Sequence, residues 1–222
     1  MLRRVEAASL VLFLAAAADV WFGGLGTRLD AAVGDWVLAH VDASSRATFD
    51  DMLSAPGHSE VAIGVMVLAA GLCLALGRWF NAAVLVVGSA VVVLATSGLK
   101  MLYARERPLE ALDADAFPSG HVTKAVVVWG LSFAMVLDAL WHRKRGSLPG
   151  LGASPSWYPN MCVAWVLLVA VTAAGRVFSG EHWLTDVVAS IALGTAVVCE
   201  VLVQHDRLAA AAEPDRPRDP PP

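Results

Sequence analysis

Six stretches of the chain are apolar over nearly the full length that a bilayer requires of a spanning helix, which is about 20 residues. They lie from Ala7 to Leu25, Val61 to Gly77, Trp79 to Leu99 and Val122 to Trp141, within Trp157 to Gly175, and from Asp186 to Gln204. Apolar residues fill whole turns in these stretches instead of one stripe, as in helices surrounded by lipid and other helices. We therefore predict an all-α fold, a polytopic membrane bundle of about six transmembrane helices.

The composition agrees with a membrane protein and excludes several other classes. Hydrophobic residues make up 57% of the chain and charged residues 16%, with a mean hydropathy of +0.62, whereas soluble domains contain about 25% charged residues. Extensive disorder needs the opposite balance. The net charge of −4 offers no basic face for nucleic acid. Cys73, Cys162 and Cys199 lie far apart in apolar stretches, which predicts buried thiols and neither disulfides nor a metal site.

The connections between the apolar stretches differ in character. Residues 26–59 mix apolar and acidic residues, which predicts one or two short amphipathic helices at the membrane interface. We expect residues 1–208 to form a single transmembrane domain and residues 209–222 to form a disordered, proline-rich cytoplasmic tail. Arg3 and Arg4 before an apolar run also resemble a cleavable signal peptide, but the run continues through Phe22, so we expect a retained span.

Basic residues near the span ends predict the orientation in the membrane. With the N-terminus inside and the tail left out, inner and outer segments hold seven Lys and Arg residues each. Three of the outer seven, Lys100, Arg107 and Arg176, belong to polar motifs described next, and the densest basic cluster is Arg143 to Arg145. We therefore expect an inside N-terminus, with residues 100–121 and 176–186 outside.

Two polar motifs surround the start of the fourth apolar stretch. Lys100 and Arg107 end the third stretch, and Pro108 stops its helix. Taken alone, two such cations fit head-group anchors equally well. Pro118, Ser119, Gly120 and His121 then lead into the fourth stretch. They offer a hydroxyl, a close approach to unpaired helix N–H groups that attract anions, and a proton donor.

A third motif joins the fifth and sixth stretches. His182 and Asp186 are four residues apart, so a helix would place them on one face. A carboxylate that holds one imidazole nitrogen makes the other a better nucleophile. Arg176 supplies a planar guanidinium suited to phosphate. A metal site built on His182 and Asp186 lacks a convincing third ligand, so we expect no metal here.

The order and spacing of Lys-x6-Arg-Pro, Pro-Ser-Gly-His and Arg-x5-His-x3-Asp resemble the signature of the type 2 phosphatidic acid phosphatase (PAP2) family. This is the membrane branch of the superfamily that includes vanadium haloperoxidases. The resemblance implies a metal-independent lipid phosphate phosphatase without a cofactor and with a phosphohistidine intermediate. It implies that His182 is the nucleophile with Asp186 as its partner, that His121 is the general acid, and that the phosphate is held by Lys100, Arg107, Ser119, Gly120 and Arg176.

The chain departs from the family pattern at Gly175, where the family usually has serine, so one phosphate hydrogen bond is expected to be absent. Lys124 lies three residues beyond His121 and is either a head-group contact or a lysine that reaches the interface without a role.

The leading functional prediction is an integral membrane phosphatase for a lipid phosphate or pyrophosphate of the undecaprenyl pyrophosphate, phosphatidate or phosphatidylglycerophosphate class. We expect a bacterial inner membrane location with the active site facing the periplasm. An anion- or lipid-binding transporter or flippase without hydrolysis is the alternative, and a vanadate-dependent halide-oxidising enzyme is disfavoured by the apolar spans. The oligomeric state is left open.

Overall fold

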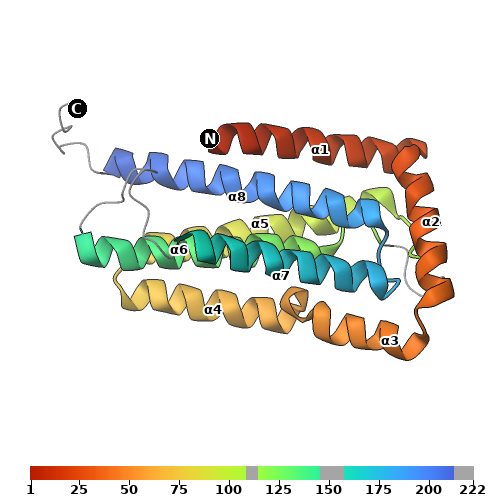
Figure 1. Cartoon of the computed structure of the whole chain (residues 1–222). Helices are drawn as coiled ribbons and strands as arrows, with labels where there is room; N and C mark the ends of the chain where they lie inside the picture. Colours follow the sequence, from red (N-terminus) through yellow and green to blue (C-terminus); the bar gives the residue numbers. More distant parts are fainter. Residues whose placement is uncertain (109–114, 146–157, 213–222) are drawn as a thin grey trace.

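The computed structural model describes residues 1–108, 115–145 and 158–212, and this part of the chain contains helices and no strands. Long helices run side by side along one axis (Figure 1). They are α1 (Leu2–Phe22), α4 (Ser59–Ala75), α5 (Trp79–Tyr103), α6 (Gly120–Arg145), α7 (Tyr158–Phe178) and α8 (Leu184–Ala212). Each predicted apolar stretch lies largely on one of these helices, so the expected all-α membrane bundle is confirmed. The first stretch was predicted to run to Leu25, but α1 ends at Phe22 and Leu25 opens α2.

Five of these helices, all except α4, are long and apolar enough to cross a membrane. The apolar helix α4 has 17 residues, and at 1.5 Å per residue it reaches about 26 Å. This is slightly less than the ~30 Å hydrocarbon thickness of a typical bilayer. The second of the six predicted spans therefore lies on a helix slightly shorter than the others.

Helix α6 forms the centre of the bundle. Its residues Val122, Val126, Leu131 and Met135 are fully buried and belong to one core cluster with side chains of α4, α5, α7 and α8. The outer helices expose large apolar side chains, as lipid-facing surfaces do, and Leu94 of α5 is 72% exposed. Cys73 and Cys199 are buried as predicted, but Cys162 lies exposed on α7.

Asp138 and Glu200, two charged residues within the long helices, have partners. Asp138 of α6 accepts a hydrogen bond from Asn81 Nδ2 at 2.8 Å and lies 3.5 Å from Arg78. Glu200 of α8 pairs with Arg3, which joins the start of α1 to the last turns of α8. These contacts all lie at the end of the bundle where α1 begins, away from the three sequence motifs (Figure 1).

The segment after α1 crosses the opposite end of the bundle. Helix α2 (Leu25–His40) runs across the axis of the long helices, and α3 (Ala43–Thr48) follows (Figure 1). A π-helical turn, η1 (Phe49–Leu53), and a 3₁₀ turn, η2 (Ala55–Gly57), then lead into α4. The prediction of one or two short helices in residues 26–59 is confirmed by α2 and α3, with two shorter helical turns after them, and their place at the membrane interface stays a prediction.

Asp19 fixes the corner between α1 and α2. Its carboxylate accepts the backbone N–H groups of Gly26 at 3.0 Å and of Thr27 at 2.8 Å. These are first-turn N–H groups without a helical partner, which a carboxylate satisfies well. A charge that the sequence places inside an apolar stretch therefore sets the direction of α2.

The C-terminal boundary differs from the prediction. Helix α8 continues to Ala212, so residues 209–212 are helical and not part of a disordered tail. Their alanines are strong helix formers, and Pro214 follows two residues after the helix ends. The rest of the predicted tail, residues 213–222, lies outside the described residues.

Candidate active site

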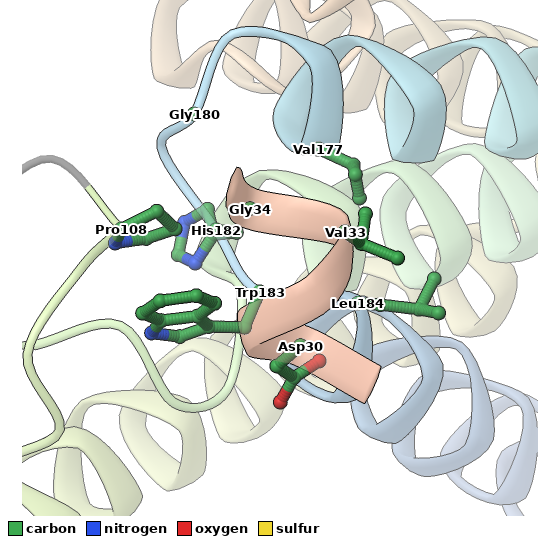
Figure 2. A pocket seen from close by; sticks show the side chains of 9 residues that line it. All are labelled: Asp30, Val33, Gly34, Pro108, Val177, Gly180, His182, Trp183 and Leu184. Carbon is green, nitrogen blue, oxygen red and sulfur yellow. The ribbon is translucent and has the colours of Figure 1, made fainter. Parts of the chain in front are cut away.

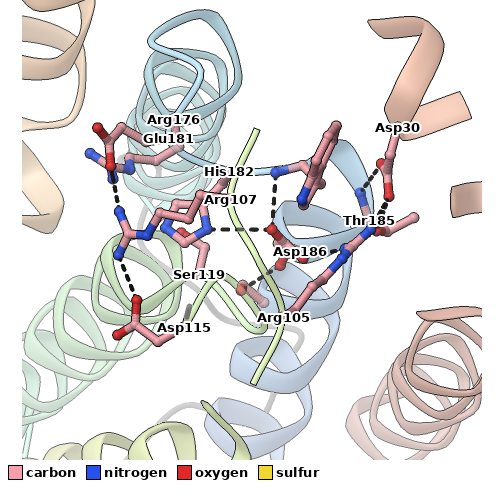
Figure 3. Close-up of polar contacts among 12 residues, drawn as sticks. Asp30, Arg105, Arg107, Asp115, Ser119, Arg176, Glu181, His182, Thr185 and Asp186 are labelled. Atoms are coloured by element: carbon pink, nitrogen blue, oxygen red, sulfur yellow. Dashed lines mark hydrogen bonds and ion pairs between the residues drawn. The ribbon is translucent and has the colours of Figure 1, made fainter. Parts of the chain in front are cut away.

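The three sequence motifs meet at the end of the bundle that α2 crosses (Figure 3). Their residues come from the ends of α5 and α7, the segment before α6 and its first turns, and the turn that opens α8. In chain order they are Lys100, Arg107, Ser119, Gly120, His121, Lys124, Arg176, His182 and Asp186. All the residues to which the sequence assigned chemistry therefore lie at one end of the molecule.

Two left-handed backbone positions bring the motif segments together. Ala104 adopts φ 43° at the end of α5, where its N–H caps Lys100 O at 2.9 Å and turns the chain back over the bundle. Gly180 adopts φ 77° after α7, a conformation that glycine adopts without strain. The tight turn that results lets the His182 N–H bond to Arg176 O at 3.1 Å.

His182 and Asp186 form a buried pair. Their side chains are 1% and 0% exposed, and His182 Nδ1 lies 3.5 Å from Asp186 Oδ2. Burial lowers the pKa of His182 and outweighs the opposing effect of the Asp186 carboxylate. The imidazole is therefore neutral at pH 7. With Nδ1 turned to Asp186, Nε2 is the nitrogen available for nucleophilic attack.

Carboxylates hold the terminal nitrogens of the motif cations. Glu181 bridges Arg107 and Arg176, and its Oε2 lies 3.2 Å from Arg176 Nη2. Asp115 accepts from Arg107 at 2.9 Å and from Lys100 at 3.2 Å, and Asp50 pairs with Arg176.

These ion pairs shift the ionisation of their members. Burial alone would raise the pKa of Asp115, but hydrogen bonds from Arg107 and Lys100 hold it below its usual value. Burial alone would lower the pKa of Arg107, but Asp115 and Glu181 raise it. The Arg107 guanidinium is thereby kept charged and the Asp115 carboxyl ionised, and the ion pairs fix both side chains in place.

Several buried polar atoms next to these ion pairs have no hydrogen-bond partner in the part of the chain that the structure describes. They are Nε of Arg107, Nε of Arg176, Oγ of Ser119 and Nδ1 of His182. A buried polar group without a partner costs about 1–3 kcal/mol, so native proteins usually satisfy such groups. The two guanidinium N–H groups and the hydroxyl are donors suited to an anion.

Gly120 and His121 open α6 beside this cluster. A Cβ at position 120 would lie 3.7 Å from Lys100 Cε, so the backbone faces the lysine without obstruction. The half-buried His121 has its ring centroid 5.4 Å from that of His58. His58 directly precedes α4, and the sequence motifs gave it no place at the site.

Lys124 lies on the same side of α6 as His121 and points to α4. Its Nζ donates to Ser59 Oγ at 2.9 Å. The chain thus gives this lysine a neutral hydroxyl partner at the edge of the site. Its proposed contact with a head group stays a prediction.

The structure explains the departure at Gly175. A Cβ at this position would lie 2.8 Å from Leu53 Cβ, 2.9 Å from Ser54 Oγ and 3.0 Å from the Leu53 carbonyl carbon. The η1–η2 connection therefore fills the space that a serine side chain would take. The buried Ser54 hydroxyl makes no helix cap, and the described residues offer it no partner.

Sequence reasoning missed the acidic residues and one arginine of the site. Asp50, Asp115 and Glu181 hold the motif cations, while Asp30 and Arg105 contact the start of α8. Glu181 directly precedes His182, and Arg105 lies inside the first motif, so adjacency was an available signal for these two. Asp30 and Asp50 belong to segments where the sequence gives no sign of which acidic residues are buried.

No group of three or more His, Cys, Asp and Glu side chains that could hold a metal ion occurs in residues 1–108, 115–145 and 158–212. The acidic residues of the site instead pair with arginine and lysine.

The PAP2 superfamily profile matches residues 80–209, which is more than half of the chain and includes every predicted site residue. The chain belongs to the PAP2 superfamily. No curated protein sequence matches it. Among solved structures, it is similar to the first transmembrane PAP2 type phosphatidylglycerolphosphate phosphatase from Bacillus subtilis. The TM-score is 0.74 at 18% identity, over 91% of this chain and 96% of that chain. At this identity the likeness shows a shared PAP2 membrane fold.

Restoring the usual PAP2 serine should destabilise this protein. Gly175→Ser would force the new Cβ against Leu53, an overpacking that costs about 1–3 kcal/mol. Thermal unfolding in detergent measures the effect as a lower Tm. Gly64→Ser is the matched control, because a Cβ at position 64 of helix α4 meets nothing within 4 Å. Equal Tm values for the two variants would contradict the packing explanation.

Proposed function

We propose that this protein is an integral membrane phosphatase that hydrolyses a lipid phosphate or pyrophosphate through a phosphohistidine at His182. The observation that supports this most directly is the buried His182–Asp186 pair beside arginines that keep buried, unpartnered Nε atoms. A neutral imidazole whose Nδ1 faces the Asp186 carboxylate at 3.5 Å is a nucleophile, and the open donors suit the anion that it would attack.

The first half-reaction transfers the phosphoryl group to the enzyme. Arg107, Arg176 and Ser119 bind the phosphate oxygens, and Nε2 of His182 attacks phosphorus. The bond from phosphorus to the lipid oxygen breaks as the N–P bond forms, and His121 gives its proton to the departing oxygen. Asp186 stabilises the positive charge that develops on the imidazole.

The second half-reaction returns the enzyme to its starting state. His121, now neutral, takes a proton from a water molecule as that water attacks the phosphohistidine. The N–P bond breaks, inorganic phosphate leaves, and His121 holds the proton that it needs for the next cycle. Positive side chains stabilise the transition state in both steps, so the mechanism requires no metal.

The position of the site favours a substrate that arrives within the bilayer. The catalytic groups lie at the ends of the spanning helices, beside α2. On α2, Leu25 and Leu29 are 75% and 58% exposed, as on a helix that lies in a membrane interface. A head group would thus reach the cations while its chains stay in lipid. Undecaprenyl pyrophosphate, phosphatidate and phosphatidylglycerophosphate all meet this requirement.

Purified protein should release phosphate from a short-chain lipid phosphate in excess EDTA, and vanadate should inhibit it.

His182→Ala should abolish turnover because no phosphoenzyme can form. Asp186→Asn should fold and lose most of its rate, since the imidazole loses its orienting charge. Activity that requires a divalent metal, or a His182→Ala variant with near-normal turnover, would refute the mechanism. Binding without turnover in the wild type would indicate a transporter instead.

The catalytic end should face outside the cytoplasm. A cysteine at Ala43, an exposed position next to α2, should react with a membrane-impermeant maleimide in intact cells. A cysteine at Asp206, whose side chain is 63% exposed at the other end of α8, should react only after lysis. Both variants are made with Cys162 replaced by alanine, because that thiol is exposed. The reverse labelling pattern would overturn the orientation.

Lys124 should select doubly charged head groups. Lys124→Met keeps the length and removes the charge, and the loss of one charged hydrogen bond costs about 1–3 kcal/mol. We expect kcat/KM for a lipid pyrophosphate to fall about 10-fold or more, with a much smaller fall for a monophosphate.

Ser59→Ala provides the matched control for Lys124→Met, because it removes the protein partner of Lys124 and leaves the ammonium in place. If kcat/KM falls by the same factor for both substrates, or changes for neither, Lys124 does not select the head group.

A further inference from the structure

Arg105 bridges two buried carboxylates, although it is not one of the motif cations. Its Nη2 donates to Asp30 Oδ2 at 2.7 Å, and its Nη1 donates to Asp186 Oδ1 at 2.5 Å (Figure 3). Nη1 also lies 2.7 Å from Thr185 Oγ1, and the guanidinium carbon lies 5.5 Å from the centre of the Trp183 ring. The Arg105 side chain is 12% exposed, so water screens these contacts weakly.

Asp30 ties α2 to the first turn of α8. Its Oδ1 accepts the Thr185 backbone N–H at 2.9 Å, and its Oδ2 accepts the Thr185 hydroxyl at 2.5 Å. The backbone bond satisfies an N–H group that has no partner within its own helix. A carboxylate from a separate helix thereby holds the start of the helix that carries Asp186.

Glycines on the same face of α2 allow this close approach. A Cβ at Gly26 would lie 2.8 Å from Thr185 Cγ2, and a Cβ at Gly34 would lie 2.9 Å from the Trp183 ring. Figure 2 shows Gly34 beside the loop of His182 and Trp183, where α2 and the loop line a cavity of about 10 Å³. The side of α2 that carries Asp30 therefore packs directly against the catalytic loop.

The two oxygens of Asp186 have different partners. Oδ1 accepts from Arg105, while Oδ2 accepts the Trp183 N–H at 2.9 Å and lies 3.5 Å from His182 Nδ1. With Oδ1 held by Arg105, the carboxylate cannot rotate away, and Oδ2 stays turned to the imidazole.

We propose that Arg105 and Asp30 are positioning residues that clamp the Asp186 carboxylate against His182, so that the catalytic pair forms only when α2 is docked. This inference rests on the proposed role of His182. Two carboxylates and one guanidinium leave one negative charge beside Nδ1. That charge stabilises the imidazolium that forms when Nε2 bonds to phosphorus.

The test measures kcat, KM and vanadate inhibition for Arg105→Gln, Asp30→Asn and the double variant. Arg105 touches no phosphate, so the clamp predicts a kcat about 10- to 100-fold lower for Arg105→Gln, the effect of losing a hydrogen bond to a charged group. KM should change less than about twofold, because the phosphate ligands stay in place, while vanadate inhibition should weaken together with kcat, because a transition-state analogue depends on the same imidazole. Arg107→Gln, which removes a proposed phosphate ligand, should raise KM as well.

The double variant separates positioning from charge balance. Asp30→Asn with Arg105→Gln removes one charge of each sign, so the cluster keeps its net charge. If a single variant fails to fold because it buries an unbalanced charge, the double variant should fold again. The clamp predicts that kcat stays low in this folded double variant, because Asp186 is no longer held. Arg28→Gln with Asp35→Asn is the matched control, because it makes the same exchange at two exposed positions of α2.

Recovery of wild-type kcat in the double variant would overturn the inference, and so would a loss in Arg105→Gln that appears in KM and leaves kcat unchanged. Wild type and His182→Ala are measured in the same assay. A turnover that survives His182→Ala refutes the proposed function, whereas a full rate in the Arg105 variants refutes the clamp alone.

Discussion

The buried carboxylate of Asp186 determines how the catalytic end of the bundle is built, because a charge that water does not reach must find partners within the protein. The partners come from two places: Arg105 lies after α5, and the loop before α8 supplies the Trp183 N–H and the His182 imidazole. Arg105 in turn is held by Asp30 of α2. One ionised group thus joins segments that are far apart in the sequence and fixes the nucleophile among them.

The bundle and the motif residues could be predicted from the sequence, because both depend on local patterns. Long apolar stretches mark helices, and a histidine four residues before an aspartate predicts a pair on one helix face. The roles of Asp30 and Asp50 could not be predicted in this way. Acidic residues in an amphipathic segment look alike whether they face water or the protein, and only the direction of α2 across the bundle decides between them. The extra turn at residues 209–212 was missed for a simpler reason, since the four alanines were assigned to the proline-rich tail that follows them.

The glycine at position 175 shows how a departure from a family pattern is absorbed by a neighbouring segment. A serine there would collide with the η1–η2 connection, so the glycine and that connection form one packing unit. The same connection places Gly57 against the His121 backbone, where a Cβ would lie 2.5 Å from His121 O. The segment between α3 and α4 therefore packs against both α6 and α7 at the site. Two glycines, Gly57 and Gly175, allow this close packing.

The site carries no net positive charge before any substrate arrives. Five cations stand against six carboxylates: Lys100, Arg105, Arg107, Lys124 and Arg176 against Asp30, Asp50, Glu60, Asp115, Glu181 and Asp186. Salt screens charges over ~8–10 Å at physiological ionic strength. Because the site also has no net positive charge, it does not attract a phosphate ester from the surrounding water. A soluble ester gains no diffusional steering from such a surface. A lipid that already moves in the plane of the membrane needs no such steering. Its phosphate interacts with the site cations only on contact.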